Sequence, residues 1–98
     1  MNLEHKVYEK LLKVPKGKVT TYSELAKAVG LKNGQRAIGR IMNKNPFPVI
    51  VPCHRVILSN GKIGGYAWGE NVKASMLSKE GIEIKNGKIL DSNKIYRF

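Results

Sequence analysis

Residues 21–44, with the sequence TYSELAKAVGLKNGQRAIGRIMNK, predict two short helices joined by a turn. Thr21 and Glu24 have the spacing of a capping box, in which the threonine side chain bonds to the first turn of a helix. Gly30 suits the left-handed conformation that follows a helix end. The residues of this first helix that we expect to face the core are Leu25, Ala26 and Val29.

The second helix is predicted over residues 34–43, with Asn33 as its cap. Its apolar face is expected to consist of Ala37, Ile38, Ile41 and Met42. The opposite side carries three basic residues four positions apart, Arg36, Arg40 and Lys44. Two short helices with a basic outer face are typical of the helix-turn-helix motif of DNA-binding proteins. A helical hairpin with a solvated basic face has the same pattern.

Two further helices are expected on either side of this motif. The first covers residues 3–13 and ends before Pro15, because a proline disfavours helical backbone at the preceding residue. The second covers residues 70–80. Its inward-facing residues are expected to be Val72, Met76 and Leu77.

Two turns predict small β hairpins. Ser59–Asn60–Gly61 predicts a hairpin over residues 57–63, and Asn86–Gly87 predicts another over residues 82–90. The fold class predicted from all these elements is mostly α with small β hairpins. The first hairpin would be the wing of a winged helix-turn-helix, in a single domain over residues 1–98.

Positive charge is concentrated around the predicted motif. The chain has 98 residues and a formal net charge of +11, from 18 Lys and Arg residues against seven Asp and Glu residues. Residues 10–62 contain eleven of the basic residues and one acid, Glu24, so they hold +10 of the total. This distribution favours a polyanionic partner such as double-stranded DNA, although a lysine-rich surface alone would give the same count.

The composition also excludes several classes of protein. No apolar run approaches the roughly 18 residues of a membrane span, and the N-terminus lacks the apolar core of a signal peptide. One cysteine excludes an internal disulfide, and one Cys with two His residues does not support a structural zinc site. We therefore expect a protein of the cytoplasm, or of the nucleus in a eukaryote, with no membrane partner, metal or other cofactor.

Cys53 is a candidate nucleophile. It follows Pro52 and precedes His54 and Arg55, and cationic neighbours lower the pKa of a thiol. Glu80 is a candidate third member that would orient and polarise the histidine. Adjacent side chains do not face each other on a helix or strand, so a link from Cys53 to His54 needs a special turn or a bridging water. An inert buried cysteine is compatible with the same residues.

The residues around Cys53 resemble the active-site signature of the O6-alkylguanine-DNA alkyltransferases. The signature consists of Pro52–Cys53–His54–Arg55–Val56, preceded by Asn45–Pro46–x–Pro48 and followed by Gly64–Gly65–Tyr66. Further matches at the family's spacings are Arg36–Ala37–Ile38–Gly39, Lys73 and Glu80–Gly81. The resemblance covers roughly residues 5–81.

The resemblance implies a suicide DNA-repair protein that binds the minor groove as a monomer and flips a damaged guanine out of the duplex. The O6-alkyl group would then move irreversibly to Cys53. His54 would deprotonate the thiol through a water, with Glu80 behind the histidine. Asn45 would brace the turn that presents the cysteine.

The resemblance also implies a set of DNA contacts. Tyr22 would lie by the target phosphate, help to extrude the base and donate a proton to guanine N3. Arg36 would fill the gap left by the flipped nucleotide. The other residues implied in DNA binding are Ala37, Gly39 and Lys44.

The same resemblance implies a pocket for the flipped base. The backbone carbonyls of Cys53 and Val56 would accept hydrogen bonds from the guanine amino group. The 65–68 loop would close over the ring, and Lys73 would tie that loop or the cysteine loop by hydrogen bonding. The implied pocket residues are Val56, Tyr66, Ala67, Trp68 and Lys73.

The sequence departs from the family pattern in three ways. Family members usually carry a further N-terminal domain, which these 98 residues do not contain. Ala67 replaces a serine found in many members, and Trp68 occupies a position that is small in some members. A large ring at Trp68 would narrow the pocket for bulky alkyl groups such as benzyl.

Two other functions remain open from the sequence. The first is a non-enzymatic lesion sensor like the alkyltransferase-like proteins, although these usually replace the reactive cysteine that is present here as Cys53. The second is a winged-helix regulator with an inert cysteine, which would bind undamaged DNA in a sequence-specific manner.

Overall fold

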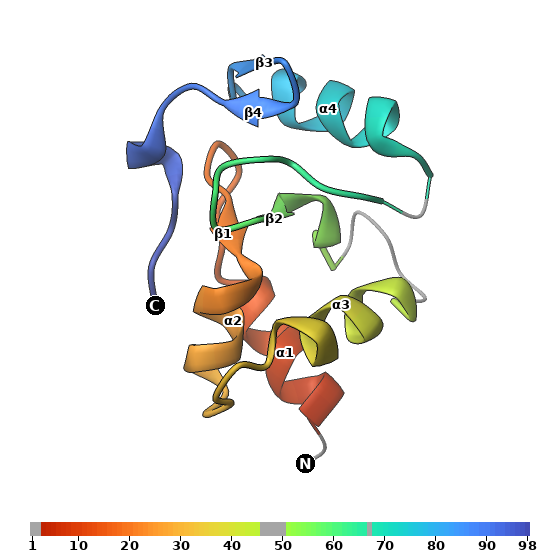
Figure 1. The fold of residues 1–98 in the computed structure, drawn as a ribbon, viewed down its shortest axis with the longest axis vertical. Coiled ribbons are helices and arrows are strands. Elements are labelled where there is room, and N and C mark those ends of the chain that lie inside the picture. Colours follow the sequence, from red (N-terminus) through yellow and green to blue (C-terminus); the bar gives the residue numbers. More distant parts are fainter. Residues whose placement is uncertain (1–2, 46–50, 67) are drawn as a thin grey trace.

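The structure is a computed structural model that describes residues 3–45, 51–66 and 68–98. Three helices, each in contact with the other two, form one end of the molecule, at the bottom of Figure 1. They are α1 (Leu3–Leu11), α2 (Tyr22–Ala28) and α3 (Gln35–Asn43). Their apolar faces enclose the larger of two hydrophobic cores.

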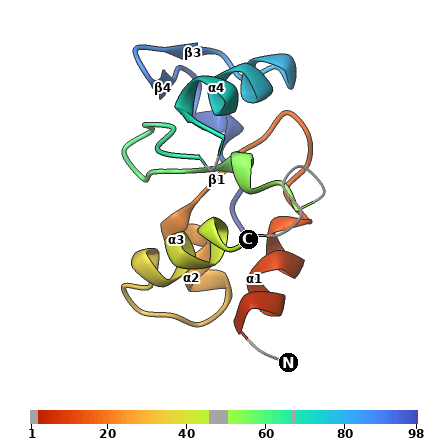
Figure 2. The same cartoon turned by 90° about the vertical axis from the view of Figure 1, so that its right-hand side faces the viewer.

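Short elements at the middle of the molecule connect the three-helix end to the opposite end. Figures 1 and 2 both show them between the three helices and a second layer at the top. The middle elements are β1 (Thr20–Thr21), the 3-10 helix η1 (Cys53–Arg55) and β2 (Val56–Ile57). The top layer consists of α4 (Glu70–Lys79), β3 (Ile84–Lys85) and β4 (Lys88–Ile89), and is followed by the 3-10 helix η2 (Ser92–Lys94).

Strand β2 links the two cores because successive side chains of a strand point to opposite sides. Val56 lies in the core of the three-helix end, and Ile57 lies in the second core beneath α4. The second core consists of Val19, Ile57, Ile63, Leu77 and Ile82. Cys53 lies at the boundary, among the buried residues of the first core.

The helix-turn-helix predicted from residues 21–44 is present as α2 and α3. The Thr21 hydroxyl accepts a hydrogen bond from the Glu24 N–H at 3.0 Å, as the capping box predicts. Gly30 has a φ of +81°, the left-handed conformation expected past the helix end. Three of the four residues predicted for the apolar face of α3 are buried: Ile38, Ile41 and Met42.

The cap predicted for α3 is wrong. Asn33 has a φ of 52°, a conformation that asparagine tolerates, and the residue before the helix is Gly34. A Cβ at Gly34 would lie 2.6 Å from Cβ of Leu31, so the turn between α2 and α3 needs a glycine there. Close packing in the turn, rather than a side-chain cap, therefore sets the start of α3.

The inward face predicted for α4 is also partly wrong. Leu77 is buried as expected, but Val72 is 39 % exposed and its neighbour Lys73 is fully buried. The Lys73 amine donates hydrogen bonds to the carbonyls of Val56 at 2.6 Å and Gly65 at 3.2 Å. These acceptors satisfy an amine that burial alone would strongly disfavour.

The hairpin predicted over residues 82–90 is confirmed, since β3 and β4 pair in antiparallel fashion. The one predicted over residues 57–63 is correct only at its turn, where the Leu58 N–H donates to the Lys62 carbonyl at 2.9 Å. Strand β2 instead pairs in parallel with β1, and Lys62 forms a bridge with Lys88. The mostly α fold class with small β elements is confirmed.

Helices α1 and α4 end slightly before the predicted boundaries, at Leu11 and Lys79. Within the described residues, no helix has the length and apolar character needed to cross a membrane.

Candidate active site

The turn that presents Cys53 is held by the backbone on both sides. The Cys53 N–H donates to the Val51 carbonyl at 2.7 Å, and the Arg55 N–H donates to the Pro52 carbonyl at 3.0 Å. The Asn45 side-chain amide also donates to the Val51 carbonyl, at 2.9 Å. Asn45 thereby joins the end of α3 to the turn before the cysteine, which is the contact expected of it from the sequence.

His54 is paired with Glu80, the residue that follows α4. The His54 Nε2 lies 3.0 Å from Oε2 of Glu80, and the imidazole is only 1 % exposed. The other ring nitrogen, Nδ1, is buried and has no hydrogen-bond partner among the described residues. Residues 26 positions apart therefore form the His–Glu pair predicted from the sequence.

Arg55 holds the Glu80 carboxylate from the other side. Its Nε donates to Oε1 at 2.9 Å and a terminal nitrogen donates to Oε2 at 2.7 Å, which is the bidentate geometry of a strong ion pair. The remaining terminal nitrogen donates to the Val14 carbonyl at 3.0 Å, in the turn after α1. The guanidinium of Arg55 thus binds the Glu80 carboxylate and the Val14 carbonyl. From the sequence, we expected it instead to act as a cationic neighbour of the Cys53 thiol.

The protonation states of this network follow from its environment. Burial lowers the pKa of His54, and the hydrogen bond that His54 donates to Glu80, which acts in the opposite direction, does not overcome it. Burial raises the pKa of Glu80, but hydrogen bonds from Arg55 and His54 outweigh burial and leave that pKa below its ordinary value. Near pH 7 the carboxylate is ionised and can only accept, so Nε2 of the neutral imidazole carries the hydrogen and Nδ1 carries the free lone pair.

Three tyrosines lie within electrostatic reach of Cys53. Burial and then the charge of Cys53 raise the pKa of Tyr66 to about 12, and both causes also raise the pKa of Tyr22. Tyr8 of α1 has a raised pKa from burial, Glu4 and Cys53, and its hydroxyl donates to the Ile41 carbonyl at 3.2 Å. Tyr8 lies within the helix predicted over residues 3–13, and no motif in the sequence connected it with the cysteine.

The buried amine of Lys73 joins two parts of the site. Its hydrogen bonds tie the Val56 carbonyl, just after η1, to the Gly65 carbonyl in the loop before α4. Burial lowers the pKa of Lys73 to about 8, against smaller opposite effects of Cys53 and Glu70. The hydrogen bonds expected from the sequence for this lysine are therefore present.

Aromatic rings continue from the histidine to the surface. Tyr66 contacts His54 edge-to-face with ring centroids 6.5 Å apart, and Trp68 contacts Tyr66 in the same way at 5.8 Å. The Trp68 side chain is 54 % exposed. Ala67, also predicted for this loop, lies outside the described residues.

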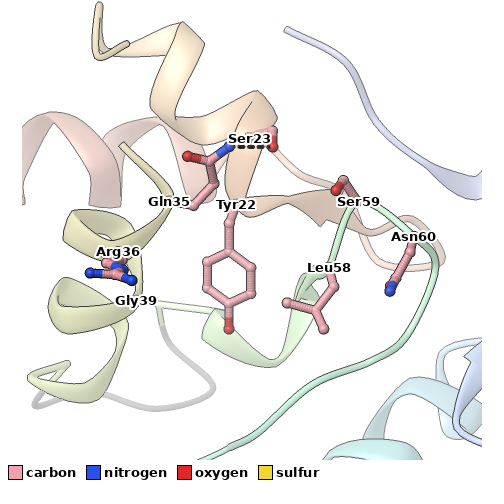
Figure 3. Close-up of a pocket in the computed structure, with 8 residues that line it drawn as sticks. All are labelled: Tyr22, Ser23, Gln35, Arg36, Gly39, Leu58, Ser59 and Asn60. Carbon is pink, nitrogen blue, oxygen red and sulfur yellow. Dashed lines mark hydrogen bonds between the residues drawn. The ribbon is translucent and has the colours of Figure 1, made fainter. Parts of the chain in front are cut away.

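A pocket of about 430 Å³ separates α3 from the turn after β2. The Tyr22 ring points from the start of α2 into this pocket, between Arg36 on one side and Leu58 on the other (Figure 3). The Gln35 amide donates to the Ser23 hydroxyl at 3.1 Å along its edge. The residues that line the pocket are Tyr22, Ser23, Gln35, Arg36, Gly39, Leu58, Ser59 and Asn60.

The residues predicted for DNA binding are not all at this pocket. Arg36 and Gly39 line it, and a Cβ at Gly39 would meet open space. Lys44 follows the last turn of α3 and, with Ala37, borders a different depression between α1 and α3. The exposed basic side of α3 therefore extends from the pocket to the N-terminal helix.

Within the part of the chain that the structure describes, no three His, Cys, Asp or Glu residues are grouped in a way that could hold a metal ion. The chemistry available at Cys53 is that of a thiol with a neutral imidazole nearby. Together, the fold and the site define a helix-turn-helix protein with a buried cysteine beside a His–Glu–Arg network.

Comparison with known proteins identifies the family. Residues 2–82 match the model described as 6-O-methylguanine DNA methyltransferase, DNA binding domain. The chain belongs to this family, as the residues around Cys53 suggested.

Two relatives are named as methylated-DNA–protein-cysteine methyltransferases. A methylated-DNA–protein-cysteine methyltransferase of Candida glabrata is 42 % identical over 87 residues, which are 89 % of this chain and 42 % of that protein. One of Methanosarcina acetivorans is 47 % identical over 75 residues, which are 76 % of this chain and 48 % of that protein. The chain thus spans about half the length of these relatives.

Two solved structures show the same fold. Mycobacterium tuberculosis OGT in complex with DNA superimposes with a TM-score of 0.79 at 38 % identity, over 83 % of this chain and 49 % of that one. S. pombe Atl1 in complex with damaged DNA containing O6-carboxymethylguanine has a TM-score of 0.85 at 32 % identity, over 99 % of both chains.

Proposed function

We propose that this protein repairs O6-alkylguanine in double-stranded DNA by moving the alkyl group to Cys53, once per protein molecule. The observation that carries this proposal is the buried Cys53 on a braced turn next to the His54–Glu80–Arg55 network, in a chain of this family. Metal chemistry is not required, because a thiolate is itself a strong nucleophile for an alkyl carbon.

The transfer balances within the site and the substrate. The thiol of Cys53 gives its proton, through a water, to the free Nδ1 of His54. The sulfur then forms a bond to the alkyl carbon while the bond from that carbon to O6 breaks, and its electron pair remains on the guanine. The guanine takes up one proton, so the sum is one alkyl group moved to sulfur and one proton moved from sulfur to the base.

Tyr22 and Arg36 are proposed to prepare the substrate. Because the pKa of Tyr22 is raised, its hydroxyl stays protonated and remains a hydrogen-bond donor for the phosphate or for guanine N3. Arg36 is exposed near the start of α3 and faces the pocket that Tyr22 enters, where it can fill the space of the flipped nucleotide. Ala37, Gly39 and Lys44 are proposed to lie along the minor groove.

The residues proposed to form the base pocket are Val56, Tyr66, Trp68 and Lys73, together with Ala67, which lies outside the described residues. The Cys53 carbonyl already accepts a hydrogen bond from the Val56 N–H, and the Val56 carbonyl accepts one from Lys73. Each carbonyl keeps a second lone pair for the guanine amino group. The protein is proposed to act as a monomer, in the cytoplasm of a prokaryote or the nucleus of a eukaryote.

The proposal is tested by the mass of the intact protein after incubation with a duplex containing O6-methylguanine. We expect a gain of about 14 Da, one CH₂, on Cys53, because the transferred methyl group replaces the thiol hydrogen. The Cys53→Ala variant should show no gain. A wild-type chain that stays unmodified at excess lesion would refute alkyl transfer.

A second candidate is a lesion-binding protein without transfer activity. It is favoured by the likeness to S. pombe Atl1, which covers 99 % of both chains and was solved with damaged DNA. Two features favour alkyl transfer over lesion binding alone. Cys53 is present, and hydrogen bonds hold the turn that carries it. Tight binding to the methylated duplex together with an unmodified thiol in the same mass experiment would establish the lesion-binding function instead.

A further inference from the structure

The C-terminal segment, residues 91–98, pairs with the backbone that leads into Tyr22. The Val19 N–H donates to the Lys94 carbonyl at 2.9 Å, and the Tyr96 N–H donates back to the Val19 carbonyl. Val19 and Ile95 thereby form a parallel bridge. Figure 1 shows the segment descending along the flank of the molecule from the β3–β4 hairpin to α2.

Side chains reinforce this pairing next to α2. The hydroxyl of Thr20, which is fully buried, donates to the Tyr96 carbonyl at 3.0 Å. Arg97 pairs with Glu24 in the first turn of α2 at 3.2 Å. Because Arg97 is mostly exposed, its ion pair adds little to stability, and the buried Thr20 bond and the backbone pairing are the stronger contacts.

Strand β1 therefore has a partner on either side. Its Thr20 and Thr21 pair with β2, which directly follows the Cys53 turn. The C-terminal segment holds the Val19–Thr20 stretch from another direction, and Tyr22 begins α2 immediately after β1. The position of the Tyr22 ring in its pocket relative to Cys53 thus depends on a strand that the C-terminal segment helps to fix.

The segment packs against both cores. Ile95 packs against the second core, whereas Tyr96 packs against the core of the three helices. The residues that match the family model end at residue 82, before this segment begins. The side-chain hydrogen bonds that His54, Arg55 and Glu80 make among the described residues involve none of residues 91–98.

We propose that residues 91–98 are a positioning element for Tyr22, and that they promote extrusion of the damaged base from the duplex rather than the transfer step at Cys53. This inference rests on the proposed function. It predicts that damage to the segment weakens reactions that need base extrusion and spares reactions that do not. A purely structural role would weaken both alike.

The experiment compares two substrates, a duplex containing O6-methylguanine and the free base O6-methylguanine. Rates of methyl uptake by Cys53 are measured for the wild type, for a chain truncated after Leu90 and for Thr20→Val. Thr20→Val removes only the hydroxyl that bonds to Tyr96, so it answers the question even if the truncated chain does not fold. We expect the ratio of the duplex rate to the free-base rate to fall about tenfold on truncation, because small misplacements are costly in positioned reactions, and to fall in the same direction for Thr20→Val.

Ile89→Ala is the matched control. Ile89 is half-buried, packs against the second core and pairs with Ile84 of β3 rather than with β1. Ile89→Ala therefore destabilises the same end of the molecule without removing a strand partner of β1. Its rate ratio should equal that of the wild type. Equal losses on both substrates in Thr20→Val, or the same ratio change in Ile89→Ala, would overturn the positioning role.

Affinity for the methylated duplex gives a second readout that needs no transfer. Thr20→Val should bind the duplex more weakly than the wild type, whereas Ile89→Ala should not. A wild-type chain that binds but never gains mass refutes alkyl transfer, and the affinity comparison then decides the positioning role by itself. Unchanged affinity in Thr20→Val would count against the inference.

Discussion

At the scale of single residues, Glu80 determines which atom of His54 can act as a base. Its carboxylate binds Arg55 with both oxygens and leaves Nε2 of the imidazole as the donor. The free lone pair therefore lies on Nδ1, which has no other partner among the described residues. The rate of alkyl transfer should follow the protonation of this one imidazole.

The first prediction concerns the pH dependence of that rate. Because burial keeps the pKa of His54 below its ordinary value of 6.5, the imidazole is neutral at pH 7 and becomes protonated only in more acidic solution. Single-turnover transfer from methylated duplex should hold its rate down to about pH 6.5 and fall below it. His54→Gln should be slow and lack this acid limb. A wild-type rate that already halves between pH 8 and pH 7 would contradict the assignment.

The second prediction concerns the buried amine of Lys73. The unfolded chain keeps this proton up to the ordinary pKa of 10.5, whereas the folded chain releases it near pH 8. Between these values the unfolded state binds more protons, so the contribution of Lys73 to the free energy of unfolding increases with pH. The difference in unfolding free energy between wild type and Lys73→Met, measured by urea denaturation, should therefore rise from pH 8 to pH 10. A constant difference would show that the folded amine keeps its ordinary pKa.

At the scale of elements, the start of α2 depends on a side-chain cap and the start of α3 does not. Thr21 accepts the Glu24 N–H, whereas Gly34 precedes α3 without a side-chain bond. The two helices of the motif are therefore sensitive to different substitutions. A lost hydroxyl affects α2, and an added Cβ affects the turn before α3.

The third prediction tests the cap of α2. Thr21→Ala should lower the free energy of unfolding by about 1 kcal/mol, because the N–H of Glu24 loses its acceptor. Thr21→Ser keeps the hydroxyl and removes only a methyl group, so it should retain most of the stability. Thermal or urea unfolding of the pair provides the measurement. Equal losses in both variants would attribute the effect to the methyl group instead of the cap.

At the scale of the whole molecule, the basic residues are divided between an exposed side of α3 and the internal network beside Cys53. Arg36, Arg40 and Lys44 lie exposed along α3, whereas Arg55 is bound internally to Glu80. Part of the basic excess is therefore committed to the site and unavailable to DNA. The exposed basic side of α3 remains the main candidate for phosphate contacts.

The fourth prediction concerns the salt dependence of DNA binding. The logarithm of the association constant should fall steeply with the logarithm of salt concentration, by about 0.9 for each phosphate neutralised. Replacing Arg36, Arg40 and Lys44 together by Gln should flatten this slope. Replacing Lys79, Lys85 and Lys88 by Gln removes the same charge from α4 and the β3–β4 hairpin, and should leave the slope nearly unchanged. Equal flattening in both triple variants would place the DNA elsewhere.

Local sequence patterns predicted the helices well, because apolar periodicity and capping residues involve only residues that are close together in the chain. Apolar periodicity indicated α1 and α3, and Thr21 with Glu24 indicated the start of α2. The motif around Cys53 also predicted the pairing of His54 with Glu80, because a family signature records contacts between residues distant in the sequence. Where neither signal was available, the predictions were incomplete or wrong.

The burial of Lys73 shows why the remaining features were not predictable. A lysine is buried only where the fold supplies acceptors, and these come from Val56 and Gly65, outside its own helix. The parallel pairing of β1 with β2 involves two residues from each strand, which is too short for a strand pattern to appear. Both features arise from tertiary contacts.

Trp68 gives the protein an intrinsic fluorescence probe close to the candidate active site. It is the single tryptophan of the chain, half in solvent, and its ring contacts Tyr66, which in turn contacts His54. Indole emission depends on the polarity around the ring, so all tryptophan fluorescence of this protein originates from a ring that Tyr66 connects to His54, the residue after Cys53. If the proposed function holds, occupation of the site by a base or methylation of the sulfur is expected to change this emission, which can be followed in real time without any attached label.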